Sequence, residues 1–183
     1  MVRTSTPEDD HLVRGAAAAL LGLALWSQGT LEAAVHHYAA GMTSLQQVDM
    51  VADVITGALA LSEMQAARGR LREAERTLEQ AIQRARQQTD PSLYGLADLL
   101  VRLSEIHYER NQLELANDQL HVSQQAASGI GVMHDRVRWC VAMAQVRVAD
   151  GDLQGALDLL DEAESRYVRD FAPNVRPIPA QRA

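Results

Sequence analysis

The histidines are the first residues to test for chemistry, because imidazole binds metals and transfers protons near neutral pH. The chain has six of them, at His11, His36, His37, His107, His121 and His134. No HxxxH or HExxH spacing occurs, so the arrangement that places two ligands one helical turn apart is missing. On a helix the adjacent rings of His36 and His37 would diverge by about 100°. We therefore expect no metal ion.

The single cysteine, Cys140, is the one candidate for a thiol nucleophile. It lies between Trp139 and Val141 in a predicted helix, a setting that favours a buried, unreactive thiol. The motifs GxSxG, SxxK and GxGxxG are absent from the sequence. An acidic run near the C-terminus is most simply a solvated helix face: Asp158, Asp161, Glu162 and Glu164. These patterns predict a protein that is not an enzyme and has no cofactor.

Charge and cysteine usage narrow the class of protein further. The 17 basic side chains are all arginines, and 24 acidic residues give a formal net charge of −7. An acidic chain is a poor partner for a phosphate backbone, and a lysine-free chain cannot carry a GxxxxGK[ST] phosphate loop. One cysteine predicts a reducing, cytoplasmic setting without a disulfide framework. The apolar stretch 16–26 is too short to span a membrane and has no basic start, so neither a membrane segment nor a signal peptide is expected.

Helices must position any binding residues. Between Pro7 and Pro91, and again between Pro91 and Pro173, the chain is proline-free and rich in Ala, Leu, Glu, Gln and Arg, which favour helices. No stretch alternates apolar and polar residues as a strand would. Asp90 and Pro91 suit the N-cap and first position of a helix. The fold class is therefore all-α, with eight helices over about residues 10–28, 31–46, 49–68, 71–88, 91–110, 113–127, 132–149 and 153–168.

Four of the turns between these helices repeat one pattern. Each has Gly or Asn, then leucine two residues later, then alanine three further on. The leucines Leu31, Leu71, Leu113 and Leu153 are spaced by 40, 42 and 40 residues. The turn residues should adopt the left-handed conformation that ends one helix and reverses the chain: Gly29, Gly69, Asn111 and Gly151. We expect each leucine to pack into the hinge of its hairpin, and internal periodicity of this length indicates a stacked helical array.

Small residues recur at fixed distances from each turn, where two helices would cross closely. The alanines are Ala34, Ala74, Ala116 and Ala156. Seven residues before the turn lie Gly22, Ser62, Ser104 and Ala144, and seven after each alanine lie Gly41, Ala81, Ser123 and Ala163. A large residue follows four after each alanine: Tyr38, Leu78, Leu120 and Leu160. Four copies in register predict helix hairpins of one type.

This pattern resembles the tetratricopeptide repeat (TPR), whose small and turn positions match Gly22, Gly29, Ala34 and Gly41 and their equivalents. Tyr38 keeps an aromatic position, while leucines replace the others. The period exceeds the usual 34 residues by about one helical turn per helix. That lengthening resembles the repeats of MalT-like transcriptional regulators of the LuxR family. The resemblance covers residues ~10–170 and implies a right-handed superhelical solenoid of about four hairpins.

The implied organisation has three parts. Residues 1–9 would be a flexible N-terminus, and residues 10–169 a repeat domain with units of about 10–47, 48–89, 90–130 and 131–169. Residues 170–183 would be a tail or the truncated start of a further repeat. In MalT-like regulators an ATPase module precedes the repeats and a helix-turn-helix follows them. This chain would then be the sensor segment alone, with DNA bound only through domains outside it.

In the TPR family the first helix of each hairpin lines the concave face, which suggests where a ligand would bind. The ligand-binding candidates are Trp26, Glu63, Asp98, Arg102, Glu105, Tyr108, Arg138 and Gln145. Aromatic and polar side chains together suit a sugar or a peptide. Arg102 is spaced to pair with Glu105 or Glu109. Alternatively, Trp26 and Tyr108 pack between hairpins and the polar residues only solvate the groove.

Two functions remain open. The first is a non-catalytic sensor domain of a MalT-like LuxR-family regulator, which binds a small-molecule inducer or a protein and thereby biases self-association. The second is a free-standing TPR scaffold for a peptide or partner protein. Because the chain has no lysine, it cannot form the usual lysine clamp of chaperone-binding TPR domains. No membrane partner is expected.

Overall fold

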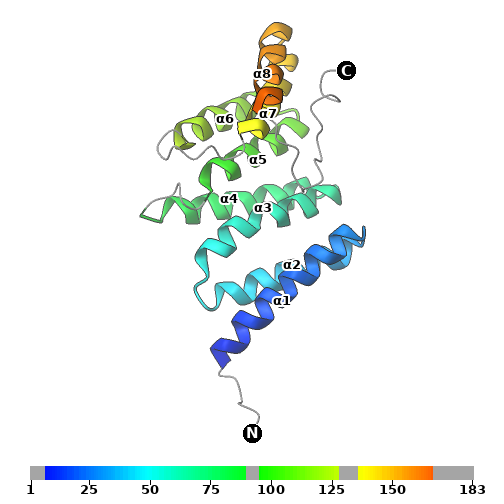
Figure 1. The fold of residues 1–183 in the computed structure, drawn as a ribbon, viewed down its shortest axis with the longest axis vertical. Helices are drawn as coiled ribbons and strands as arrows, with labels where there is room; N and C mark the ends of the chain where they lie inside the picture. The colour runs from blue at the N-terminus through cyan, green and yellow to red at the C-terminus, as the bar shows by residue number, and fades with distance from the viewer. Residues whose placement is uncertain (1–6, 90–94, 128–135, 167–183) are drawn as a thin grey trace. The chain divides into compact units, whose positions relative to one another are not determined.

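The computed structural model describes residues 7–89, 95–127 and 136–166, and the side chains from residue 10 onward. Within these ranges it consists of helices and turns without strands, so the all-α fold is confirmed (Figure 1). The helices are α1 (Pro7–Ser27), α2 (Leu31–Gln46), α3 (Val51–Ala67), α4 (Leu71–Arg86), α5 (Leu96–Glu109), α6 (Leu113–Ala127), α7 (Arg136–Ala149) and α8 (Leu153–Arg166).

The helix boundaries agree with the sequence pattern at most ends. α1 begins at Pro7, three residues before the expected start at residue 10. The expected cap at Asp90, the expected helix start near residue 132 and the segment 170–183 lie outside the described residues. The chain divides into two compact units, Met1–Gly95 and Leu96–Ala183. The first contains the hairpins α1/α2 and α3/α4, and the second contains α5/α6 and α7/α8.

The left-handed turns are confirmed in all four hairpins. The φ angles are +78° at Gly29, +74° at Gly69, +58° at Asn111 and +83° at Gly151. In each turn, the residue that follows the left-handed one donates a backbone hydrogen bond to the carbonyl oxygen five residues before it. Examples are Thr30 N to Leu25 O at 2.9 Å and Asp152 N to Arg147 O at 2.9 Å. The left-handed residue itself donates three residues back, which completes a Schellman-type cap. One turn geometry is therefore repeated four times.

A further left-handed turn, between α2 and α3, was not predicted. Asp49 has φ +54°, and Met50 N donates to Leu45 O at 3.1 Å. Aspartate tolerates this conformation better than most residues. The same cap geometry thus links the two hairpins of the first unit.

The predicted small positions lie where helices cross. Ala34, Ala74 and Ala116 are 0% exposed and Ala156 is 2% exposed. A Cβ added to Gly22 would lie 2.7 Å from Tyr38 Cβ, so only glycine permits this approach of α1 to α2. The expectation that every turn leucine packs into its hinge is wrong for one, because Leu153 is 62% exposed.

Each unit has its own apolar cluster. In the first unit Ala34 and Tyr38 of α2 pack with Met64 of α3. In the second, α7 packs against α5, α6 and α8 in a larger cluster that includes Val101, Leu120 and Leu160. Packing within each hairpin and between successive hairpins together therefore forms the core of each unit.

Candidate functional site

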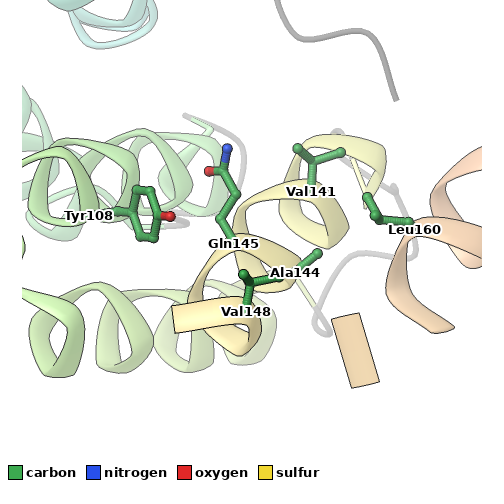
Figure 2. Close-up of a pocket in the computed structure, with 6 residues that line it drawn as sticks. All are labelled: Tyr108, Val141, Ala144, Gln145, Val148 and Leu160. Carbon is green, nitrogen blue, oxygen red and sulfur yellow. The ribbon is translucent and has the colours of Figure 1, made fainter. Parts of the chain in front are cut away.

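The second unit contains a cavity of about 170 Å³. Helix α7 provides most of its wall, and α5 and α8 complete it (Figure 2). The lining residues are Tyr108, Val141, Ala144, Gln145, Val148 and Leu160. The four α7 residues are spaced at three, four and seven positions, so they share one face of the helix. Val141 is buried and Val148 is 50% exposed, so this wall runs from the interior toward solvent.

The polar groups of the cavity come from Tyr108 and Gln145. Tyr108 lies in the last turn of α5 and reaches toward α7, where Gln145 lies beside it in Figure 2. Both side chains are half-buried. A phenol and a carboxamide can each donate and accept hydrogen bonds, while the other four lining residues are aliphatic. The cavity therefore suits a neutral group that is partly apolar and partly hydrogen-bonding.

An ion-pair network ties α5 to α7 one helical turn from the cavity. Arg138 makes a two-fold contact with Glu105, with Nε to Oε1 at 3.0 Å and Nη2 to Oε2 at 2.9 Å. Arg102 Nη1 donates to Glu105 Oε2 at 2.8 Å, which confirms one of its two expected pairings. Glu105 lies three residues before Tyr108, and Arg138 lies three residues before Val141. The network therefore joins the two helices that carry the cavity's polar groups.

The side chains of this network are mostly buried, so its role is to hold α5 and α7 together. The side chains of Arg102 and Glu105 are 6% and 2% exposed, against 27% for Arg138. A buried ion pair is costly to break because the remaining charge stays desolvated. Any contribution of Arg102 and Glu105 to binding is therefore through the relative position of α5 and α7.

A second network joins α7 to α8. Arg136 Nε donates to Glu162 Oε1 at 2.9 Å, and Arg166 Nε lies 3.1 Å from the same oxygen. The hydrogen bond from Arg136 lowers the pKa of Glu162. The prediction that the acidic run is a solvated helix face is therefore wrong for Glu162. The sequence could not reveal this pairing, because Arg136 lies 26 residues away.

The expected inertness of Cys140 agrees with its surroundings. The residue is 0% exposed, and burial raises its thiol pKa to about 11. Its neighbour Trp139 donates from Nε1 to Leu120 O at 2.9 Å, and the Arg136 guanidinium lies 4.1 Å from the centre of its ring. A protonated, buried thiol is a poor nucleophile.

The eight predicted binding residues are divided between the two units. Trp26 and Glu63 belong to the first unit, and Trp26 packs against the Tyr38–Met64 cluster. Among the six in the second unit, Tyr108 and Gln145 line the cavity. The other four are Arg102, Glu105 and Arg138 in the network and half-buried Asp98 on α5.

Two lining residues, Ala144 and Leu160, occupy positions that the repeat pattern predicts for helix packing. Ala144 is the small residue seven positions before the turn, and Leu160 is the large residue four after the repeat alanine. A small side chain at Ala144 leaves space beside it. The small and large positions of the repeat therefore contained a signal for the cavity that the choice of aromatic and polar candidates missed.

Other kinds of site are not seen in the described part of the chain. No group of three or more His, Cys, Asp or Glu side chains there could hold a metal ion. None of the described helices combines the length and hydropathy needed to cross a membrane.

Helix hairpins with left-handed turns and small residues at their crossings define a helical repeat protein of the tetratricopeptide class. The family model of the MalT-like TPR region matches residues 4–183, and the chain belongs to that family. The crystal structure of BtubC (BKLC) from P. vanneervenii has a similar fold, with a TM-score of 0.71 over 96% of this chain and 72% of that chain. The two are 15% identical, so the likeness concerns the fold alone. A comparison with curated proteins gave no match.

Proposed function

We propose that this chain is the non-catalytic sensor domain of a MalT-like LuxR-family transcriptional regulator of the cytoplasm, and that it binds its inducer at the cavity beside Tyr108 and Gln145. Membership of the MalT-like TPR family supports the sensor role. The observation that supports this binding site is the cavity, which is lined by two polar side chains and otherwise by aliphatic ones. DNA would be bound by domains outside this chain.

The size of the cavity limits the ligand. Sites for whole drug-sized ligands measure roughly 300–1,000 Å³, and this one measures about 170 Å³. It fits one sugar ring or one apolar peptide side chain, with the rest of the ligand outside. Gln145 and Tyr108 would bond the polar edge of that group, and Val141 and Leu160 would contact its apolar face.

Ligand binding would act by shifting the equilibrium between states of the domain. The cavity is bounded by three helices, α5, α7 and α8, so its occupant would contact all three. A ligand changes such an equilibrium only when its affinity differs between the states. A small change in the spacing of these helices would supply that difference and report occupancy to the rest of a regulator.

Thermal-shift screening against oligosaccharides and peptides tests the site. We expect Tyr108→Ala and Gln145→Ala each to abolish the rise in melting temperature that a binding compound causes. The helical circular dichroism of both variants should stay unchanged. Gln125→Ala, at an exposed position of α6, is the matched control and should leave the shift unchanged. A shift that survives both cavity substitutions would place the site elsewhere.

The coding sequence that flanks this segment tests the regulator role. An ATPase module upstream and a helix-turn-helix downstream are expected. A reading frame with neither module would instead support the alternative, a free-standing scaffold for a peptide or partner protein.

A further inference from the structure

The cavity of the second unit changes in polarity with depth (Figure 2). Three of its lining residues, Val141, Ala144 and Leu160, are 5%, 3% and 4% exposed, and we call them the cavity floor. All three are aliphatic. Tyr108 and Gln145 are half-buried, so the two hydrogen-bonding side chains are more accessible to solvent than the floor is.

This order of polarity favours a ligand group with an apolar tip. A group that reaches the cavity floor exchanges water for aliphatic side chains, which favours hydrocarbon. A hydroxyl group at the same place would lose its hydrogen bonds to water and gain none. A sugar ring carries hydroxyl groups around its edge, and only two of the six lining side chains are able to bond them. The floor therefore selects an aliphatic group over a sugar ring.

The charge of the lining excludes a second kind of ligand group. None of the six described lining residues is charged. One helical turn away, Arg138 makes a two-fold contact with Glu105, and Arg102 bonds the same carboxylate. A carboxylate or ammonium group in the cavity would lie beside no lining residue of opposite charge, which is costly away from water. The group that enters is therefore uncharged.

The two polar side chains of the cavity suit an amide. A carboxamide has two N–H donors and an oxygen that accepts, so Gln145 can bond the C=O and the N–H of a ligand amide together. Gln145 also has interactions within the chain, and the several bonding positions of its carboxamide allow for both. Tyr108 lies beside it in Figure 2 and adds a hydroxyl that donates or accepts. An ester or a ketone would use only the donors.

The volume of the cavity limits the size of the aliphatic group. An apolar cavity of about 150 Å³ is large enough for benzene, and this one measures about 170 Å³. The branched side chain of leucine has fewer carbon atoms than benzene and fits such a space.

We propose that the ligand of this cavity is a neutral amide that carries a branched aliphatic group. The aliphatic group would contact Val141, Ala144 and Leu160, and the amide would bond Gln145 and Tyr108. This ligand class rests on the proposed function, because it concerns what enters the same cavity. A leucine or isoleucine residue within a peptide has this chemistry, and so has a small acyl amide.

NMR titration of the isotope-labelled chain tests the ligand class with small probes. N-acetyl-leucinamide should shift the side-chain amide of Gln145 and the methyl groups of Leu160 until they saturate, with a Kd on the order of 1 mM. Each comparison probe lacks a required feature. N-acetylglycinamide has no aliphatic group, N-acetylleucine has a carboxylate, and maltose has hydroxyl groups in place of both features. Each should bind at least about tenfold more weakly.

Substitutions in the cavity test the two contacts separately. Gln145→Glu keeps the shape of the side chain, removes its N–H donors and adds a charge, so N-acetyl-leucinamide should bind at least about tenfold more weakly. Ala144→Val narrows the floor and should have the same effect. Because Ala144 is buried, circular dichroism must first show that this variant folds, and the half-buried Gln145 provides the test if it does not. Gln125→Ala, exposed on α6, is the control and should bind like wild type.

Two further probes distinguish a peptide from a small acyl amide as the source of this chemistry. Glycyl-leucyl-glycine with blocked ends should bind more tightly than N-acetyl-leucinamide if the natural ligand is a peptide. Isovaleramide should bind at least as tightly if the ligand is a small amide. Either result supports the ligand class when the same cavity resonances shift.

Other results would overturn the ligand class. One is maltose that shifts the Gln145 amide and no longer binds Gln145→Glu, which would keep the cavity as the ligand site. Another is N-acetyl-leucinamide that shifts no cavity resonance up to about 50 mM, well above the millimolar range of weak binding. A compound from the thermal-shift screen that shifts only resonances outside the cavity would instead contradict the proposed site itself.

Discussion

At the scale of single residues, the polar groups of the second unit differ in how deeply they are buried. Tyr108 and Gln145 line the cavity and are half-buried, whereas Arg102 and Glu105 are enclosed in ion pairs. Sequence spacing predicted that Arg102 would pair within its own helix. It could not predict that Arg138, on another helix 33 residues from Glu105, would complete the network. Contacts between helices decide whether a charged pair is solvated or buried.

The Arg102–Glu105–Arg138 network makes a prediction about stability. Glu105→Leu would leave two arginines without their carboxylate and should lower the free energy of unfolding by about 3 kcal/mol. Adding Arg102→Met should recover part of that loss, because the more deeply buried guanidinium is removed as well. Urea denaturation followed by circular dichroism measures both. Glu109→Gln, exposed on the same helix, is the control, and a loss as large as that of Glu105→Leu would contradict the role of burial.

The Cys140 thiol makes a prediction about alkaline pH. Burial raises its pKa from 9.0 to about 11, so the folded chain holds this proton more tightly than the unfolded chain does. The resulting stability is complete below pH 9 and is lost as pH rises through about 11, a loss of about 2 kcal/mol. The difference in unfolding free energy between wild type and Cys140→Ala, measured from pH 8 to pH 11, should change by this amount.

Thiol chemistry checks the same residue independently. A disulfide reagent at pH 8 should react with Cys140 only after denaturant is added, because the native thiol is buried and protonated. Rapid reaction of the native protein would contradict both its burial and its raised pKa.

At the scale of elements, turn chemistry made most of the fold predictable. Glycine or asparagine at four equivalent places marks four left-handed turns, and the structure has positive φ at each. The fifth turn escaped prediction because aspartate also serves as a helix N-cap and in ordinary turns, so Asp49 does not by itself indicate a left-handed conformation. Glycine is informative here because it adopts positive φ without the steric cost that other residues pay, so a turn that needs this conformation favours it.

The conformation of Gly69 leads to a prediction for the second hairpin. Nothing lies within 4 Å of a Cβ added there, so the cost of Gly69→Ala comes from φ +74° alone and should be about 1 kcal/mol. Gly69→Asn should cost less, since Asn111 occupies the equivalent position with φ +58°. Thermal or urea unfolding of the two variants measures the difference. Equal losses would show that backbone conformation does not set the cost at this turn.

At the scale of the whole molecule, the division of the core into two units bears on how the chain unfolds. Repeat proteins gain stability from neighbouring hairpins, so parts with separate clusters need not unfold together. The chain has two tryptophans, Trp26 in the first unit and Trp139 in the second. Each packs with the apolar cluster of its own unit, so each reports on one unit.

Fluorescence of single-tryptophan variants can therefore separate the two transitions. In Trp26→Phe the remaining Trp139 reports the second unit, and its urea midpoint should differ from that of the circular dichroism, which averages both units.

A ligand bound beside Tyr108 and Gln145 stabilises the folded form according to its concentration relative to Kd. In Trp26→Phe, the ligand should raise the urea midpoint reported by Trp139. In Trp139→Phe, it should leave the urea midpoint reported by Trp26 unchanged. If both tryptophans and the circular dichroism gave one midpoint, and ligand moved them together, the two units would be a single cooperative structure.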